Sequence, residues 1–120
     1  MQVLEEWYWK KGLHDAEIVE VTKHELNYDY TQKIPLRNFL EIKLNGEYAM
    51  FDTAINSIRL YNYKIIKMDS DLAFLKNSWW VKDSLVEENG KYKITLILRK
   101  EKQVCEIIIL FDKAEVLRKV

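Results

Sequence analysis

The adjacent residues His14 and Asp15 have the clearest capacity for acid–base chemistry in this sequence. An imidazole titrates near neutral pH, and a carboxylate that orients the ring can support proton transfer. On an extended strand, however, adjacent side chains point to opposite faces, so the pair would share one reaction centre only in a turn. His24 is ten residues further on, ~33 Å away along an extended strand. We interpret the pair as a structural turn or rim hydrogen bond, with a functional site as the alternative.

Asp83 is the second candidate, because the hairpin predicted around it places this carboxylate on an apolar face. Counting back from the turn puts Asp83 beside Val81 and Leu85 and opposite Leu96. A carboxylate on such a face needs polar partners or a bend in its strand. Either a β-bulge turns Asp83 outward, or it is a satisfied inward carboxylate near the centre of any site.

Aromatic side chains are the third feature, with four Trp and seven Tyr in 120 residues. Trp79 and Trp80 are adjacent, and Tyr61 and Tyr63 occupy alternate positions that share one face of a strand. Most of these rings are expected to pack in and around the core. The alternative is an exposed aromatic patch that anchors a protein partner.

Other catalytic and ligand-binding chemistry finds little support in the sequence. The single cysteine, Cys105, lies in an apolar strand pattern and is predicted to be buried and free. One Cys and two distant His do not provide the closely spaced ligands of a zinc site, and three isolated Gly cannot build a phosphate loop. We therefore predict no catalytic residue, no metal and no cofactor, and we lean against an enzyme.

The composition limits the class of protein. Nineteen Lys and Arg balance nineteen Asp and Glu, and 48% of the residues are hydrophobic. These values describe one globular domain over residues 1–120 and exclude a disordered chain. They also argue against a nucleic-acid binder, which normally carries a basic surplus. No apolar stretch approaches the ~20 residues of a membrane helix, and the N-terminus lacks a secretory pattern, so we expect a soluble, cytoplasmic protein with no membrane partner.

The zero net charge hides an asymmetry between the two halves of the chain. Residues 1–60 contain seven basic and ten acidic side chains, and residues 61–120 contain twelve basic and nine acidic ones. The halves therefore carry −3 and +3. These charges either form two solvated faces that neutralise each other or make a dipolar surface that docks a partner or a second copy.

Two Asn-Gly pairs predict β-hairpins, because both residues tolerate the positive φ angles of a type I′ turn. At Asn45-Gly46 the predicted register pairs Leu40 with Phe51 and Ile42 with Ala49, in strands 39–44 and 47–51. At Asn89-Gly90 the strands are 81–88 and 91–99, and the predicted pairs are Glu88 with Lys91, Leu85 with Ile94 and Val81 with Leu98.

Further strands are expected at residues 15–23, 57–66 and 103–111, the last covered on both faces because its residues 107–111 are all apolar. A short helix is expected at 72–75, residues 1–12 suit a short helix or equally a strand, and 113–119 suits a strand or a helical turn. A weak similarity between residues 58–62 and 108–112 suggests two related meanders or arises by chance. The fold class is therefore all-β or β-rich α+β: a mainly antiparallel β-sandwich or partly open barrel built from meanders, with one or two short helices.

Two segments resemble a group of small β-rich domains of unknown function from low-GC Gram-positive bacteria. They are residues 12–18 (Gly-Leu-His-Asp-Ala-Glu-Ile), with a His-Asp-Ala-x-Ile pattern, and residues 79–92, with a Trp-Trp-x-x-Asp pattern before the turn. The likeness could extend over residues 12 to 117. It implies an all-β bacterial protein and no established activity.

Three functions are consistent with these observations. The first is a non-enzymatic protein–protein interaction module of an inhibitor or immunity type, which uses its aromatic and charged surface. The second is a small-ligand-binding or hydrolytic protein with a site near His14, Asp15 and Asp83. The third is a structural β domain that forms a homodimer through an edge strand. The sequence names no partner or ligand.

Overall fold

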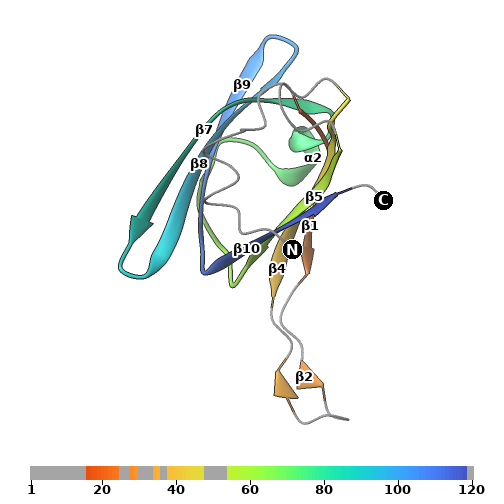
Figure 1. Cartoon of the computed structure of the whole chain (residues 1–120). Coiled ribbons are helices and arrows are strands. Elements are labelled where there is room, and N and C mark those ends of the chain that lie inside the picture. Colours follow the sequence, from red (N-terminus) through yellow and green to blue (C-terminus); the bar gives the residue numbers. More distant parts are fainter. Residues whose placement is uncertain (1–15, 25–27, 30–33, 36–37, 48–53, 119–120) are drawn as a thin grey trace.

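The computed structural model describes residues 16–24, 28–29, 34–35, 38–47 and 54–118, most of which lie in antiparallel β-strands (Figure 1). The elements are β1 (Glu17–His24), β2 (Tyr28–Asp29), β3 (Ile34–Pro35), β4 (Phe39–Asn45), β5 (Ile55–Tyr61), β6 (Lys64–Met68), α2 (Leu72–Leu75), β7 (Ser78–Glu88), β8 (Lys91–Lys100), β9 (Gln103–Phe111) and β10 (Lys113–Arg118). The predicted all-β class is thereby confirmed. In the described part of the chain, no helix is both long and apolar enough to cross a membrane.

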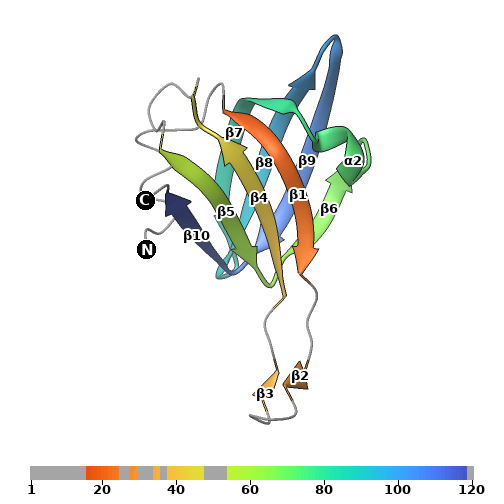
Figure 2. The same cartoon turned by 90° about the vertical axis from the view of Figure 1, so that its right-hand side faces the viewer.

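Eight strands form one sheet in the order β10-β5-β4-β1-β7-β8-β9-β6, and β2 pairs with β3 separately. The eight-stranded sheet is not closed into a barrel; it folds back on itself into two layers (Figure 2). We call β10-β5-β4-β1 the first layer and β7-β8-β9-β6 the second. Within the sheet, two residue pairs between the starts of β1 and β7 link the layers.

Each layer is a three-stranded meander that receives its fourth strand from the other. β1, β4 and β5 form the first meander, and the chain then crosses to the second layer as β6; β7, β8 and β9 form the second meander, and the chain returns to the first layer as β10. The two crossings meet at a corner, where Asp112 N–H donates to the Tyr61 carbonyl and Asn62 Nδ2 donates to Asp112 Oδ2. The predicted meander architecture is therefore observed, with exchanged edge strands.

The core lies between the layers and follows the strand alternation. Residues directly opposite each other in an antiparallel ladder share a face, so the rows through Leu60, Ile58, Leu96 and Ile109 all point inward, and these four residues are buried. The opposite rows form the outer faces of the two layers. Cys105 is free and buried in an inward row, as the sequence predicts.

The short helix α2 begins where the sequence predicts it. Asp71 is its N-cap, and the Asp71 carboxylate accepts a hydrogen bond from Phe74 N–H at 2.9 Å. The helix packs against β1 with Leu75 buried, and Asn77 N–H, just beyond the helix, donates to the Ile18 carbonyl. Residues 1–12, for which helix and strand were both open, lie outside the described residues.

The predicted hairpin at Asn45-Gly46 is wrong. β4 pairs with β1 on one edge and with β5 on the other, so Leu40 lies opposite Leu60 and Ile42 lies opposite Ile58. Both edges of β4 are therefore occupied, one by β1 and the other by β5. The Asn45 side chain instead accepts a hydrogen bond from Glu47 N–H, as Asn does in turns that need no tight hairpin.

The hairpin at Asn89-Gly90 is confirmed for most of its length. Asn89 and Gly90 have φ angles of 54° and 78°, and Glu88 pairs with Lys91 as predicted. Leu85 also lies opposite Ile94. The predicted pairing of Val81 with Leu98 is wrong, because a bulge between Trp80 and Lys82 places Trp80 opposite Leu98.

Two further expectations need correction. The predicted strand 57–66 is interrupted, because Asn62 adopts a φ of 53° at the corner and separates β5 from β6. The second concerns β9, whose residues Ile107, Ile109 and Phe111 are buried, whereas Ile108 and Leu110 are half-buried on the outer face of the second layer. The prediction that this strand is covered on both faces is therefore wrong for the described part of the chain.

The similar segments 58–62 and 108–112 occupy equivalent places in the two meanders, at the ends of their third strands. Their aligned residues nevertheless face opposite ways, since Ile58 and Leu60 are buried and Ile108 and Leu110 lie in outward rows. The two meanders therefore share a topology, but the aligned side chains point inward in one and outward in the other. Residues 113–118, for which strand and helix were both open, form the strand β10.

Candidate functional site

The Trp79–Trp80 pair is divided between the two faces of the second layer. Trp79 lies opposite Arg99 on the outer face and is 36% exposed, whereas Trp80 lies in the inward row and is 1% exposed. Trp79 is therefore a surface residue and Trp80 a core residue. The predicted site residues His14 and Asp15 lie outside the described residues.

Asp83 is a satisfied inward carboxylate, which settles the two alternatives left by the sequence. It lies opposite the buried Leu96, and its Oδ2 accepts a hydrogen bond from Trp80 Nε1 at 2.9 Å. The bulge in β7 lies before Asp83 and turns Trp80 inward, so that the indole N–H and the carboxylate come from the same face. Asp83 thus supplies the polar partner that a buried indole requires.

Tyr61 and Tyr63 do not share a face, contrary to the sequence prediction. Tyr61 lies in the outward row of β5, where its hydroxyl donates to Glu115 Oε2 at 2.9 Å. Burial, followed by this hydrogen bond, raises the pKa of Tyr61 above the usual value of 10.0. Tyr63 packs against the core, because the turn at Asn62 lies between the two residues.

Beside Tyr61, the outer face of the first layer carries an interlocked cluster that the sequence analysis did not identify. Phe39 stacks on His24 with ring centroids 4.3 Å apart, and the Arg59 guanidinium lies over the Phe39 ring. Glu41 is only 8% exposed, and its carboxylate receives Arg59 Nε at 2.9 Å. This hydrogen bond is the main cause that raises the pKa of Arg59. Because the groups satisfy one another, the cluster fits a structural role.

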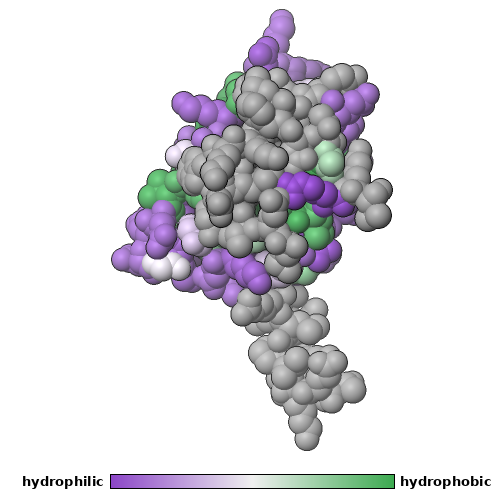
Figure 3. All heavy atoms as spheres, in the orientation of Figure 1, coloured by the Kyte–Doolittle hydropathy of each residue, from purple (hydrophilic) through white to green (hydrophobic). Residues whose placement is uncertain are grey.

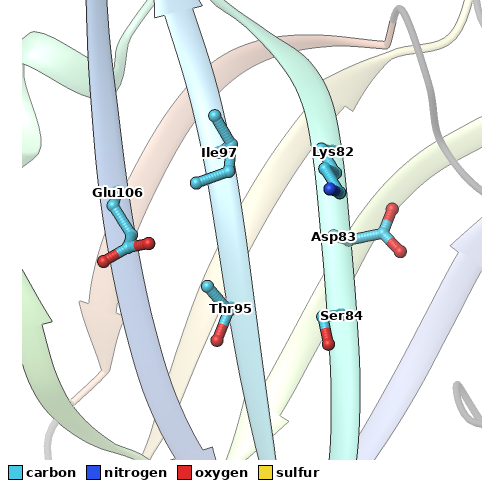
Figure 4. A pocket seen from close by; sticks show the side chains of 6 residues that line it. All are labelled: Lys82, Asp83, Ser84, Thr95, Ile97 and Glu106. Carbon is cyan, nitrogen blue, oxygen red and sulfur yellow. The ribbon is translucent and has the colours of Figure 1, made fainter.

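A depression on the outer face of the second layer is the best candidate for a binding site. It measures about 270 Å³, below the ~300–1,000 Å³ typical of small-molecule pockets. Figure 4 shows its side chains, with Asp83 turned away from the others. The lining residues come from β7, β8 and β9: Lys82, Asp83, Ser84, Thr95, Ile97 and Glu106.

Strand register explains how these side chains meet. Lys82, Ile97 and Glu106 lie opposite one another on three neighbouring strands, and Ser84 and Thr95 form the adjacent pair. Since neighbouring strands are about 4.8 Å apart, Lys82 and Glu106 stand roughly 10 Å apart with Ile97 between them. Apart from Asp83, whose side chain points away (Figure 4), the depression therefore has an apolar floor, two hydroxyls and one charge of each sign.

The two charged residues differ in their pairing. Glu106 Oε1 receives Lys67 Nζ at 2.6 Å, and this hydrogen bond, with the charge of nearby Asp69, raises the pKa of Lys67. Lys82 has no hydrogen bond or ion pair with a described residue, and the same holds for the hydroxyls of Ser84 and Thr95. The groups of the depression without a described partner are thus one ammonium group and two hydroxyls, all of which can donate a hydrogen bond.

The lining residues include neither His nor Cys, and the groups that a ligand would meet are the Lys82 ammonium group, two hydroxyls and the Glu106 carboxylate. The sequence could have revealed part of the site, because the correctly predicted pairing of Leu85 with Ile94 also places Ser84 opposite Thr95. Glu106 requires the β8–β9 register, and its Lys67 partner requires the exchange of β6 between the meanders.

The charge asymmetry of the sequence is distributed over the two outer faces. In the described rows, the outer face of the second layer has six basic and two acidic side chains, a balance of +4, and that of the first layer has three basic and four acidic ones. The residues of the second layer are Lys64, Lys67, Lys82, Lys91, Lys93 and Arg99 against Glu88 and Glu106. No ion pair between described residues of β1 and β8 joins the acidic strand to the basic hairpin.

Comparison with known proteins gives no match: no family model, no curated protein and no solved structure matches the chain. The resemblance noted for residues 12–18 and 79–92 therefore stays a prediction. The fold and the surface of the chain itself carry the functional proposal.

Proposed function

We propose that this chain is a non-enzymatic protein-binding module, of the kind that acts as an inhibitor or immunity-type protein by occupying a partner. The observation that carries the proposal is the exposed apolar surface on the outer face of the second layer. Val86 is 49% exposed, Val104 is 63% exposed, and Trp79 stands on the same face. In Figure 3 an apolar group stands out at the left, on the side of β7 and β8, between hydrophilic side chains.

Half-buried side chains connect these positions. Ile97, Ile108 and Leu110 lie in the outward rows of β8 and β9, beside the depression. Lys93 lies between Val86 and Leu110, and Arg99 lies between Trp79 and Val104, so apolar and basic side chains alternate on this face. Protein interfaces also combine apolar and polar surface. A concave spot within such a surface is where an anchoring side chain of a partner usually binds.

Site-specific photo-crosslinking tests the proposal. A photoreactive amino acid replaces Ile97 in the depression, and a matched variant carries it at Val19, which is 38% exposed in the first layer. We expect Ile97 to give one saturable adduct in a lysate of the native host, which excess unmodified chain removes. Equal labelling from both positions, or no adduct that competes, would refute a binding role for this face.

A small-ligand-binding or hydrolytic site is the second candidate, and one contact favours it. The carbonyl of Ala16, which directly follows His14 and Asp15 in the sequence, accepts a hydrogen bond from Trp80 N–H at 2.8 Å. Trp80 also holds Asp83. We expect the Asp83→Asn variant to shift the pKa of His14, measured by NMR, and the Glu87→Gln variant, at an exposed residue of the same strand, to leave it unchanged. An unaltered His14 pKa eliminates this candidate.

A further inference from the structure

The depression holds one ammonium group, which can only donate, and two hydroxyls, which can donate or accept hydrogen bonds. Lys82, Ser84 and Thr95 have no hydrogen bond or ion pair with a described residue, although all three line one small hollow. Directly opposite residues have Cβ atoms roughly 5 Å apart, so the hydroxyls of Ser84 and Thr95 can both donate to one ligand group. Lys82 precedes Ser84 by two residues and shares its face, which brings an ammonium group to the same spot.

The carboxylate on the far wall does not cancel this preference. Glu106 is tied to Lys67 on β6 by a contact of 2.6 Å, and its backbone N–H donates to Asp69 Oδ2. Lys67 also lies 3.9 Å from Asp69 Oδ1, so Glu106 shares its cation, whereas Lys82 has no ion pair with a described residue. A second anion in the depression would therefore bind at Lys82, on the wall away from Glu106. The site favours a negatively charged group on the side of β7.

The floor of the depression adds a second requirement. Ile97 separates Lys82 from Glu106. A ligand side chain with an aliphatic stem can therefore pack its stem on Ile97 while the polar group at its end reaches Lys82 and the two hydroxyls. We infer that the partner inserts an acidic side chain with an aliphatic stem, as Glu has, with its carboxylate at Lys82, Ser84 and Thr95. This inference rests on the proposed protein-binding function.

The surrounding face points to the same kind of partner. Its balance of +4 would repel the same face of a second copy and attract an acidic surface. Nucleic acid is also anionic, but its affinity comes from many phosphate contacts. Here the basic side chains are interspersed with Val86, Ile97, Val104 and Ile108, which a protein surface can cover.

NMR titration of the full chain with short peptides tests the inference. The probe is a capped hexapeptide of alternating Glu and Leu, compared with one in which Gln replaces Glu and with one in which Lys replaces it. We expect the Glu peptide to shift the amide signals of Ser84, Thr95 and Ile97 and to bind about tenfold more tightly than the Gln peptide. The Lys peptide should not bind.

Two variants locate the carboxylate. Lys82→Met keeps the aliphatic stem and should weaken the Glu peptide about tenfold, and the Ser84→Ala, Thr95→Val double variant should do the same. Lys113→Met, at an exposed lysine on the outer face of the first layer, is the matched control and should change nothing. Lys82→Met should leave the affinity for the uncharged Gln peptide unchanged, which separates loss of charge recognition from loss of fold.

The outcomes distinguish the inferred recognition of an acidic side chain from the proposed protein-binding function. If Glu and Gln peptides bind equally, or shifts arise away from the depression, the acidic side chain is refuted, even where crosslinking at Ile97 still captures a partner. If the Glu peptide binds but no adduct forms at Ile97, the protein-binding function fails and the anionic site stands alone. Tighter binding of an oligothymidylate than of the Glu peptide would also overturn the inference, in favour of nucleic acid.

Discussion

The hydrogen bond between Trp80 and Asp83 should contribute measurably to stability. Its donor belongs to a side chain that is 1% exposed, and its length is 2.9 Å. A hydrogen bond to a charged group is worth about 1.5–3 kcal/mol, and because Asp83 is half-buried we take about 2 kcal/mol for Asp83→Ala. Asp83→Asn keeps an acceptor oxygen without its charge and should cost about 1 kcal/mol.

These values translate into melting temperatures. An unfolding entropy of about 2.1 cal/mol/K per residue gives roughly 0.25 kcal/mol/K for a chain of 120 residues. Asp83→Ala should therefore lower Tm by about 8 °C and Asp83→Asn by about 4 °C. Glu87→Ala, at an exposed acidic residue of the same strand, is the matched control and should stay within about 0.5 kcal/mol of the parent.

A double-mutant cycle with Trp80→Phe isolates the pair from the packing lost with the indole ring. Urea unfolding followed by far-UV circular dichroism measures each free energy of unfolding without depending on Trp fluorescence. The expected coupling is about 1.5–2 kcal/mol. Coupling below about 0.5 kcal/mol, with Asp83→Asn and Asp83→Ala equally stable, would refute the role assigned to the carboxylate.

Three further predictions concern other parts of the fold. Because the pKa of Tyr61 is raised in the folded state, the stability that Tyr61 contributes is complete below pH about 10 and is lost as the pH rises through the folded-state pKa. Between pH ~9 and ~10.5, the urea midpoint should therefore fall less for Tyr61→Phe than for the parent. Gly90→Ala should cost about 1 kcal/mol in the same assay, because Gly90 has a φ of 78° with open space around it and the cost is purely conformational; an unchanged midpoint would contradict the turn geometry. Asp71→Ala should destabilise by about 1 kcal/mol and Asp71→Asn by much less, since Asn keeps the cap on Phe74 N–H; equal losses would show that the cap is not the cause.

Local chemistry explains which elements the sequence revealed. The turn at Asn89-Gly90 and the short helix at 72–75 depend on neighbouring residues alone, and both were predicted correctly. Asn45-Gly46 has the same turn chemistry, but its strand finds both partners elsewhere in the chain, at β1 and β5. The break at Asn62 likewise arises from the corner where two distant segments meet.

The candidate site shows the same division. Asp83 was placed opposite Leu96 from the sequence, because only the nearby turn sets that register. The hydrogen bond from Trp80 to Asp83 was not predicted, because the bulge between them shifts the register by one residue and places both side chains on one face. The interlocked cluster around Glu41 and Arg59 joins strands whose pairing no short pattern encodes.

The exchange of fourth strands has a consequence for how the chain acquires its structure. β5 gains its outer partner only when β10 arrives, about fifty residues later in the sequence, and β6 must wait for β9. Pairings so distant along the chain slow folding, because loop closure must precede the contacts that repay it. During synthesis the edge of β5 stays open until β10 emerges, a period in which edge-to-edge association competes with folding. Both meanders are therefore expected to unfold in one cooperative transition, since neither completes its layer without the other.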